Sequence, residues 1–93
     1  MVNAEELLPS LKVDLGITTE AYDDRLTAYL QNAQKEIIRE GVSIGDNVDD
    51  SQLVIMYAAW TWRKRDSGEG MPRMLRYALN NRVFSQKMGD SDG

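Results

Sequence analysis

In this 93-residue chain, the residues best suited by type and spacing to catalysis or metal binding are pairs of adjacent acidic side chains. Paired carboxylates can act as a general acid and base or bind a metal ion. Here each pair stands at or near the expected start of a helix, where negative charge complements the helix dipole and side-chain oxygens can cap free amides. We therefore interpret the pairs as helix-start residues. They are Glu5 and Glu6, Asp23 and Asp24, and Asp49 and Asp50.

Other catalytic and metal-binding patterns are missing from the sequence. The acidic loop at residues 46–50 lacks the twelve-residue ligand order and closing glutamate of an EF-hand. The chain has no histidine and no cysteine, so triads of the Ser-His and Cys-His type are excluded. Gly41 and Gly45 lack the lysine and the preceding strand of a phosphate-binding loop. We expect no enzymatic activity, no metal and no cofactor.

Charge is divided unevenly along the chain. Residues 1–52 carry four basic and eleven acidic side chains, a balance of −7, whereas residues 53–93 carry seven basic and four acidic ones, a balance of +3. One interpretation is pairing within the monomer together with ordinary solvated faces. The other is head-to-tail contact between copies, in which the acidic face of one subunit meets the basic face of the next. The sequence leaves both open.

Basic residues near two tryptophans raise the question of nucleic-acid binding. Against it, the net charge of the chain is −4, and duplex binders concentrate positive charge more strongly. We expect no specific nucleic acid recognition. We also expect no membrane contact, since no apolar run approaches the ~20 residues that cross a bilayer and the N-terminus lacks a signal-peptide pattern. The basic residues are Arg63, Lys64, Arg65, Arg73, Arg76 and Arg82, beside Trp60 and Trp62.

The elements that must position these residues are all helical. No stretch alternates with period two for long enough to predict a strand, whereas apolar residues recur at helical spacing. We predict an all-α fold, a small bundle of about four helices in a single domain at residues 1–88, followed by a disordered tail at 89–93. The helices are expected at about 4–15, 19–40, 51–65 and 72–87.

Local signals indicate where these helices begin and end. Pro9 removes an amide donor, so we favour a first helix that begins near it over a helix kinked there. Thr18 or Thr19 is expected to cap the second helix, and Gly41 to end it. The possible caps of the third helix are Asp49, Asp50 and Ser51.

The last two helices differ in how their apolar residues are arranged. The third is apolar on nearly every side at residues 53–60, so it is either central or partly covered by another subunit, which is credible in so small a domain. In the fourth, Tyr77 and Phe84 lie seven residues apart, off the main apolar stripe. They either complete the monomer core or contact a partner. The stripe itself consists of Met71, Met74, Leu75, Ala78, Leu79 and Val83.

Three segments, at residues 15–19, 60–65 and 70–82, carry a resemblance to a known family. The first is a Leu-Gly-Ile turn followed by threonines, the second ends a buried helix in aromatic and basic residues, and the third is a Pro…Leu…Arg segment. The long helix between them turns Ala33 and Ile37 inward. Over roughly residues 3–84 the chain resembles the phage head–tail connector proteins, also called adaptor or head-completion proteins. The matching positions of the third segment are Pro72, Leu75, Leu79 and Arg82.

This resemblance implies a structural protein that acts in virion assembly of a tailed double-stranded DNA phage or prophage, downstream of DNA packaging. Such a protein forms an oligomeric ring of twelve copies, joins the head portal to the tail and extends the DNA channel. Its partners are the portal protein, a stopper or tail-side connector protein, and further copies of itself. Its location is the bacterial host cytoplasm before assembly and the head–tail junction of the virion afterwards.

The resemblance also implies which residues make contacts. In the family the C-terminal segment docks against the portal or a neighbouring subunit, although the short tail after Met88 leaves no room for a long C-terminal arm. Two alternatives stay open: a generic helical protein–protein interaction module, and a small helix-turn-helix DNA-binding protein. The candidate portal or subunit contacts are Arg73, Arg76, Tyr77, Arg82 and Phe84.

Overall fold

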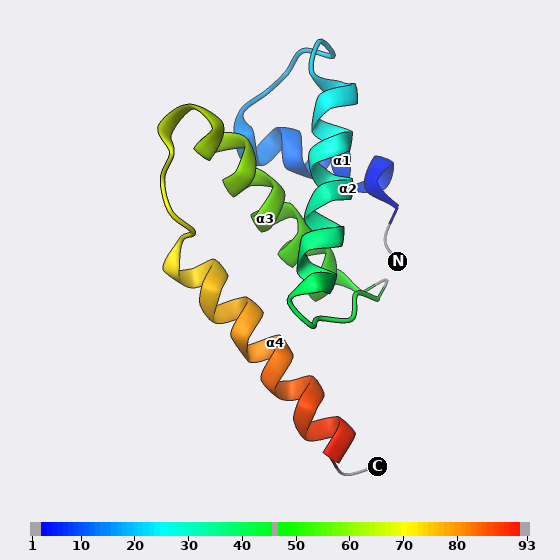
Figure 1. Ribbon diagram of the computed structural model, residues 1–93. Coiled ribbons are helices and arrows are strands. Elements are labelled where there is room, and N and C mark those ends of the chain that lie inside the picture. The colour runs from blue at the N-terminus through cyan, green and yellow to red at the C-terminus, as the bar shows by residue number, and fades with distance from the viewer. Residues whose placement is uncertain (1–2, 46, 92–93) are drawn as a thin grey trace.

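A computed structural model describes residues 3–45 and 47–91, and their side chains as far as residue 86. Over these residues the chain forms four helices and no strand, which confirms the predicted all-α fold (Figure 1). None of the described helices combines the length and the apolar character needed to cross a bilayer. The helices are α1 (Ala4–Leu15), α2 (Asp23–Arg39), α3 (Val48–Ser67) and α4 (Arg73–Ser91).

Helix α1 has the predicted bounds of about 4–15, but it begins five residues before Pro9, so the favoured later start near Pro9 is wrong. The Asn3 side chain caps the helix by accepting a hydrogen bond from Glu5 N at 2.9 Å. Ala4 and Leu7 are buried, and this burial holds the first turns of α1 against the rest of the molecule. The carbonyl that loses its amide partner at Pro9 belongs to Glu5, an exposed residue, so water can satisfy it.

Helix α2 begins later than predicted and without the predicted threonine cap. Thr19 Oγ1 accepts from Ala21 N at 3.2 Å, which closes a turn ahead of the helix. Tyr22 occupies the N-cap position and makes no side-chain capping bond there. The helix ends as predicted before Gly41, whose φ of 102° suits a residue without a side chain.

Helix α3 is longer than predicted at both ends. Its N-cap is Asn47, whose Oδ1 accepts from Asp50 N at 2.8 Å, so none of the three residues predicted as the cap fills that role. All three are inside the helix because Asn47 stands ahead of them. The helix ends at Gly68, where φ is 68° and the amide donates to Lys64 O at 2.7 Å.

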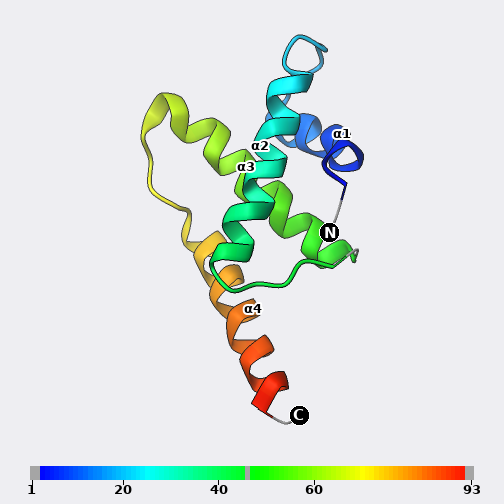
Figure 2. The same cartoon turned by 45° about the vertical axis from the view of Figure 1, so that its right-hand side comes forward.

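The core lies where α1 and α2 pack on α3. Helices α2 and α3 make the most extensive contact, and α1 crosses both (Figures 1 and 2). The central part of α3 is buried within this monomer, as the first of the two alternatives predicts; of residues 53–60, Met56 and Trp60 stay partly exposed. Trp62 closes one end of the core, with its ring 5.2 Å from that of Tyr29. The buried residues of α3 are Asp50, Leu53, Val54, Ile55, Tyr57, Ala58, Ala59 and Trp62.

Helix α4 stands apart from this three-helix body. It contacts α3, and its C-terminal half extends beyond the other helices (Figures 1 and 2). The molecule is consequently elongated, at 47 × 27 × 18 Å. Helix α4 continues to Ser91, so residues 89–91 of the predicted disordered tail are helical. The remaining two residues of that tail, 92–93, lie outside the described residues.

Candidate functional site

Helix α4 has two sides of opposite character. Leu75 and Leu79 are buried against α3, whereas Met74, Tyr77 and Phe84 are 77%, 59% and 64% exposed. Tyr77 and Phe84 are two helical turns apart and therefore lie on the same side, with Met74 one turn before Tyr77. We call these three exposed residues the α4 ridge. Large apolar side chains on a projecting helix are typical of a surface that another protein covers.

The inner side of α4 is held to the body by polar contacts as well as apolar ones. The Asp50 side chain, on α3, is 2% exposed and pairs with the Arg82 guanidinium from α4. It also accepts from Gly45 N at 2.6 Å and from Asn47 Nδ2 at 3.0 Å. These donors satisfy the carboxylate, which would otherwise be costly to bury.

The same network lowers the pKa of the buried carboxyl. Burial by itself raises the pKa of Asp50. The hydrogen bonds from Arg82, Gly45 and Asn47, together with the positive charge of Arg82, outweigh burial and hold this pKa below its ordinary value of 3.8. Asp50 is therefore ionised at neutral pH, where it anchors α4.

Two further contacts tie α4 to the connection between α2 and α3. The Gln86 amide accepts from Ser43 N at 2.7 Å and donates to Gly41 O at 2.7 Å. Arg76 pairs with Glu40 across 3.0 Å. We call this set of contacts, together with the Asp50–Arg82 pair, the polar junction. It fixes the orientation of α4, and with it the direction in which the α4 ridge faces.

The structure separates the five predicted contact residues into two groups. Tyr77 and Phe84 are on the α4 ridge, so the alternative in which they complete the monomer core is wrong. Arg73 is exposed on the same helix, four residues before Tyr77. Arg76 and Arg82 instead belong to the polar junction, where their charges are neutralised by Glu40 and Asp50. Met74, predicted on the buried stripe, is exposed.

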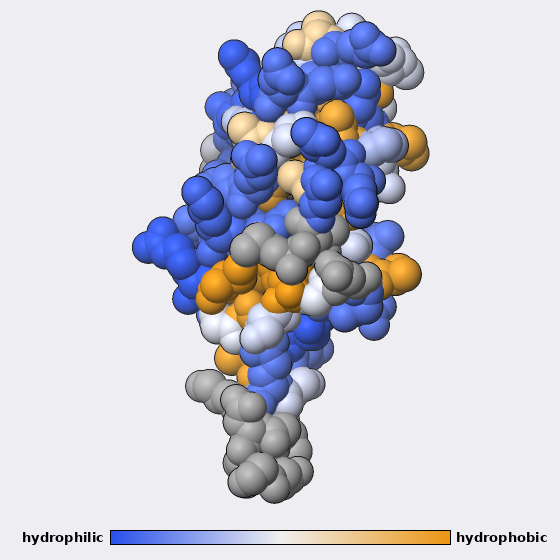
Figure 3. All heavy atoms as spheres, turned by 90° about the vertical axis from the view of Figure 1, so that its right-hand side faces the viewer, coloured by the Kyte–Doolittle hydropathy of each residue, from blue (hydrophilic) through white to orange (hydrophobic). Residues whose placement is uncertain are grey.

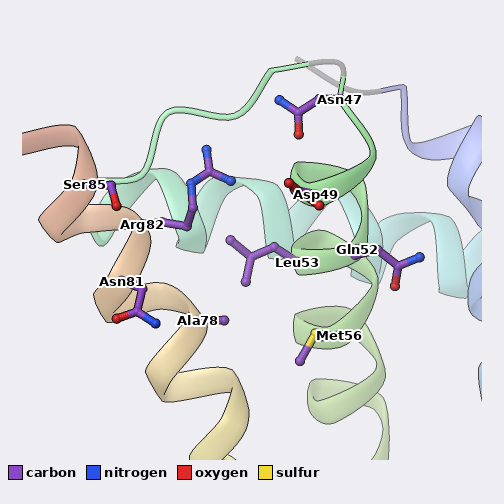
Figure 4. A pocket seen from close by; sticks show the side chains of 9 residues that line it. All are labelled: Asn47, Asp49, Gln52, Leu53, Met56, Ala78, Asn81, Arg82 and Ser85. Atoms are coloured by element: carbon purple, nitrogen blue, oxygen red, sulfur yellow. The ribbon is translucent and has the colours of Figure 1, made fainter. Parts of the chain in front are cut away.

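A groove with a volume of about 540 Å³ runs between α3 and α4 (Figure 4). Leu53, Met56 and Ala78 give it an apolar lining. Figure 4 shows Arg82 pointing from α4 towards α3 at one end of this space, where the polar junction lies. The remaining lining residues are Asn47, Asp49, Gln52, Asn81 and Ser85.

The basic end of α3 is occupied by contacts within the monomer. Lys64 Nζ lies 4.4 Å from the ring centre of Trp60, and the Arg65 guanidinium lies 3.7 Å from that of Trp62. Arg63 donates to Asp14 O at 3.1 Å. Three of the six basic residues considered for nucleic-acid binding thus lie at this end of α3, and the other three lie on α4.

No protein-family model, curated protein or solved structure matches this chain. Within residues 3–45 and 47–91, no cluster of three or more acidic residues is arranged to hold a metal ion. The most distinctive surface feature is the α4 ridge.

The sequence did not predict that Asp50, Arg76 and Arg82 form ion pairs within the monomer. Asp50 was assigned to a helix start, although it precedes the buried Leu53, Val54 and Tyr57 by three, four and seven residues. That spacing placed it on the buried face of α3. Nothing comparable in the sequence indicated the contact of Gln86 with the α2–α3 connection.

Proposed function

We propose that this protein is a structural assembly protein that forms a ring at the head–tail junction of a tailed double-stranded DNA phage, between the portal and the tail. The proposal has no catalytic step. Its partners are further copies of the chain, the portal protein and a stopper or tail-side connector protein. The ring extends the DNA channel.

The single observation that carries this proposal is the α4 ridge. Exposing a methionine, a tyrosine and a phenylalanine on one helix is unfavourable in water and becomes favourable when another protein covers them. The polar junction holds the ridge on the outside of the monomer, so the surface is formed before any partner arrives. Association can then proceed without first reorganising the helix.

The sequence resemblance supplies the identity of the assembly. It covers nearly the whole chain, and it assigns partner contacts to the C-terminal segment that carries the α4 ridge. A chain with neither histidine nor cysteine also suits a structural role, because the commonest general base and the thiol nucleophile are both lacking.

The first experiment measures self-association of the full chain by sedimentation velocity over a range of concentrations, alone and with its portal. We expect oligomers whose population falls strongly in the double variant Tyr77→Ser and Phe84→Ser. Val48→Ser is the matched control, since Val48 is 74% exposed on α3, away from the ridge, and should leave association unchanged. Equal behaviour of the ridge variant and the control contradicts the proposal.

The second experiment tests the portal. The protein is mixed with the portal protein encoded in the same genome, and the complex is imaged by electron microscopy. We expect an additional ring of density, coaxial with the portal, that is absent with the ridge variant. A genome without a portal gene, or portal particles that gain no density, contradicts the assignment to a phage connector.

A further inference from the structure

The outer face of α1 combines acidic and apolar residues. Glu6, Pro9 and Val13 are exposed and share one side of the helix, since they are separated by three and four residues. Val13 is 80% exposed, more than any other large apolar residue in the described part of the chain. Glu5 and Asp14 are exposed on either side of this row.

No free cation of α1 offsets these acids. Lys12, the one basic residue of the helix, is half-buried and pairs with Asp23 of α2 at 2.7 Å. The exposed surface of α2, by contrast, carries Arg25 and Lys35 together with acidic residues. The exposed side chains of α1 itself are therefore the more uniformly negative of the two, and the neighbouring cation is Arg63 of α3, which donates to Asp14 O at 3.1 Å at the end of the helix.

Helix α4 offers the opposite charge next to its apolar ridge. The segment 73–86 contains three arginines and no acidic residue. Arg76 and Arg82 are neutralised in the polar junction, which leaves Arg73 as the arginine of this segment without an ion pair to any described residue. Arg73 is one turn before Tyr77, so its charge stands beside the ridge.

We infer that the copies associate head to tail, with the α4 ridge and Arg73 of one copy packed against the row Glu6, Pro9 and Val13 on α1 of the next. The occupant of the ridge is thus a second copy of this chain. Apolar side chains pack on apolar side chains, and Arg73 lies opposite Glu6. This inference rests on the proposed function and specifies the interface by which the ring closes.

The placement of the two surfaces agrees with this mode of association. Helix α1 packs on α2 and α3, whereas α4 contacts α3, and Figures 1 and 2 both show α1 in the upper part of the molecule and α4 in the lower part. Figure 3, seen from the side where α1 begins, shows a mostly hydrophilic body there. Two unlike surfaces on separate sides of a subunit leave each copy able to bind two others, which produces a ring when the rotation closes.

Charge reversal tests the inference directly. In the full chain, Arg73→Glu places like charges opposite each other, and so does Glu6→Lys. Each single variant should weaken self-association about tenfold or more. The double variant Arg73→Glu with Glu6→Lys should recover to within about threefold of the unchanged protein, because the attraction is restored with its signs exchanged.

An equimolar mixture of the two single variants provides a second readout. Where the two variants alternate, the glutamate introduced at position 73 faces the lysine introduced at position 6, and at the next interface the original arginine faces the original glutamate. Both contacts are attractive, so we expect the mixture to associate more strongly than either variant alone. Lys35→Glu and Glu20→Lys are the controls, since they make similar charge reversals at exposed positions outside the proposed interface.

Each outcome bears on the inference. Single variants that associate like the unchanged protein, or a double variant and a mixture that fail to recover, overturn this interface while leaving ring formation intact. Absence of self-association in the unchanged protein, even with its portal, overturns the proposed function as well. Circular dichroism of the dilute variants confirms that each is folded.

Discussion

Asp50 and Arg82 form an ion pair that joins α3 to α4 across 32 positions of the sequence, with the carboxylate almost completely withdrawn from water. This pair is the centre of the polar junction. Among the side chains of α4 described as far as residue 86, Leu75 and Leu79 are the buried apolar ones and Ala78 and Val83 are partly buried, so polar contacts add to a small apolar contact in fixing the helix. The direction of the α4 ridge thus depends on a contact that can be removed by one substitution.

Arg82→Met should destabilise the protein by about 3 kcal/mol, because it leaves a buried carboxylate without its charged partner. Urea unfolding followed by circular dichroism measures the change. Arg73→Met is the matched control, since Arg73 is exposed, and it should change stability by less than about 0.5 kcal/mol. Equal stability of the two variants would show that the pair contributes nothing to the fold.

The stability contributed by Asp50 should depend on pH. A carboxyl whose pKa is lower in the folded state stabilises the fold above its unfolded value of 3.8, and this contribution is lost as the pH falls below 3.8 through the folded pKa. We expect Asp50→Asn to be less stable than the unchanged protein by a constant amount above about pH 5, and the difference to shrink below pH 3.8. Urea unfolding at a series of pH values measures it. A difference in stability between the two proteins that grows as the pH falls contradicts the prediction.

Leu79→Ala should cost about 3 kcal/mol, since Leu79 is completely buried where α4 packs on α3 and the substitution leaves a cavity. Met74→Ala removes a side chain of similar size from the exposed side of the same helix and should cost less than about 0.5 kcal/mol. Thermal unfolding of dilute protein compares the two. A large loss in Met74→Ala would mean that the α4 ridge is already covered in the monomer.

Gly68→Ala should destabilise the protein by about 1 kcal/mol, because Gly68 ends α3 with a φ of 68°, where a side chain is strained. Gly70→Ala, two residues later, is the control. Its added methyl group meets no atom within 4 Å and its φ is not positive, so the variant should be neutral or stabilised by up to about 1 kcal/mol. Chemical unfolding at matched protein concentration distinguishes the two glycines.

Much of the fold was predictable because its signals are local. The apolar spacing of Leu26, Leu30 and Ile37 predicts a helix, and the same residues are completely buried. Helix α1 ends at Leu15 and α2 ends before Gly41, both as the sequence predicts. The predicted bounds 4–15 of α1 are confirmed, whereas the favoured start near Pro9 is wrong because the local penalty at Pro9 was weighed without the burial of Ala4 and Leu7, which only the packed molecule supplies.

The sequence by itself determined which residues share a helical face, since that follows from 3.6 residues per turn. Only the tertiary structure decided which neighbour covers each face. Leu75, Leu79 and Arg82 continue one row along α4, yet nothing local indicates that Arg82 meets Asp50. Met74 was assigned to the same row but is exposed, because α3 covers only a narrow strip of the helix. Burial depends on contacts between segments distant in the chain, which periodicity does not encode.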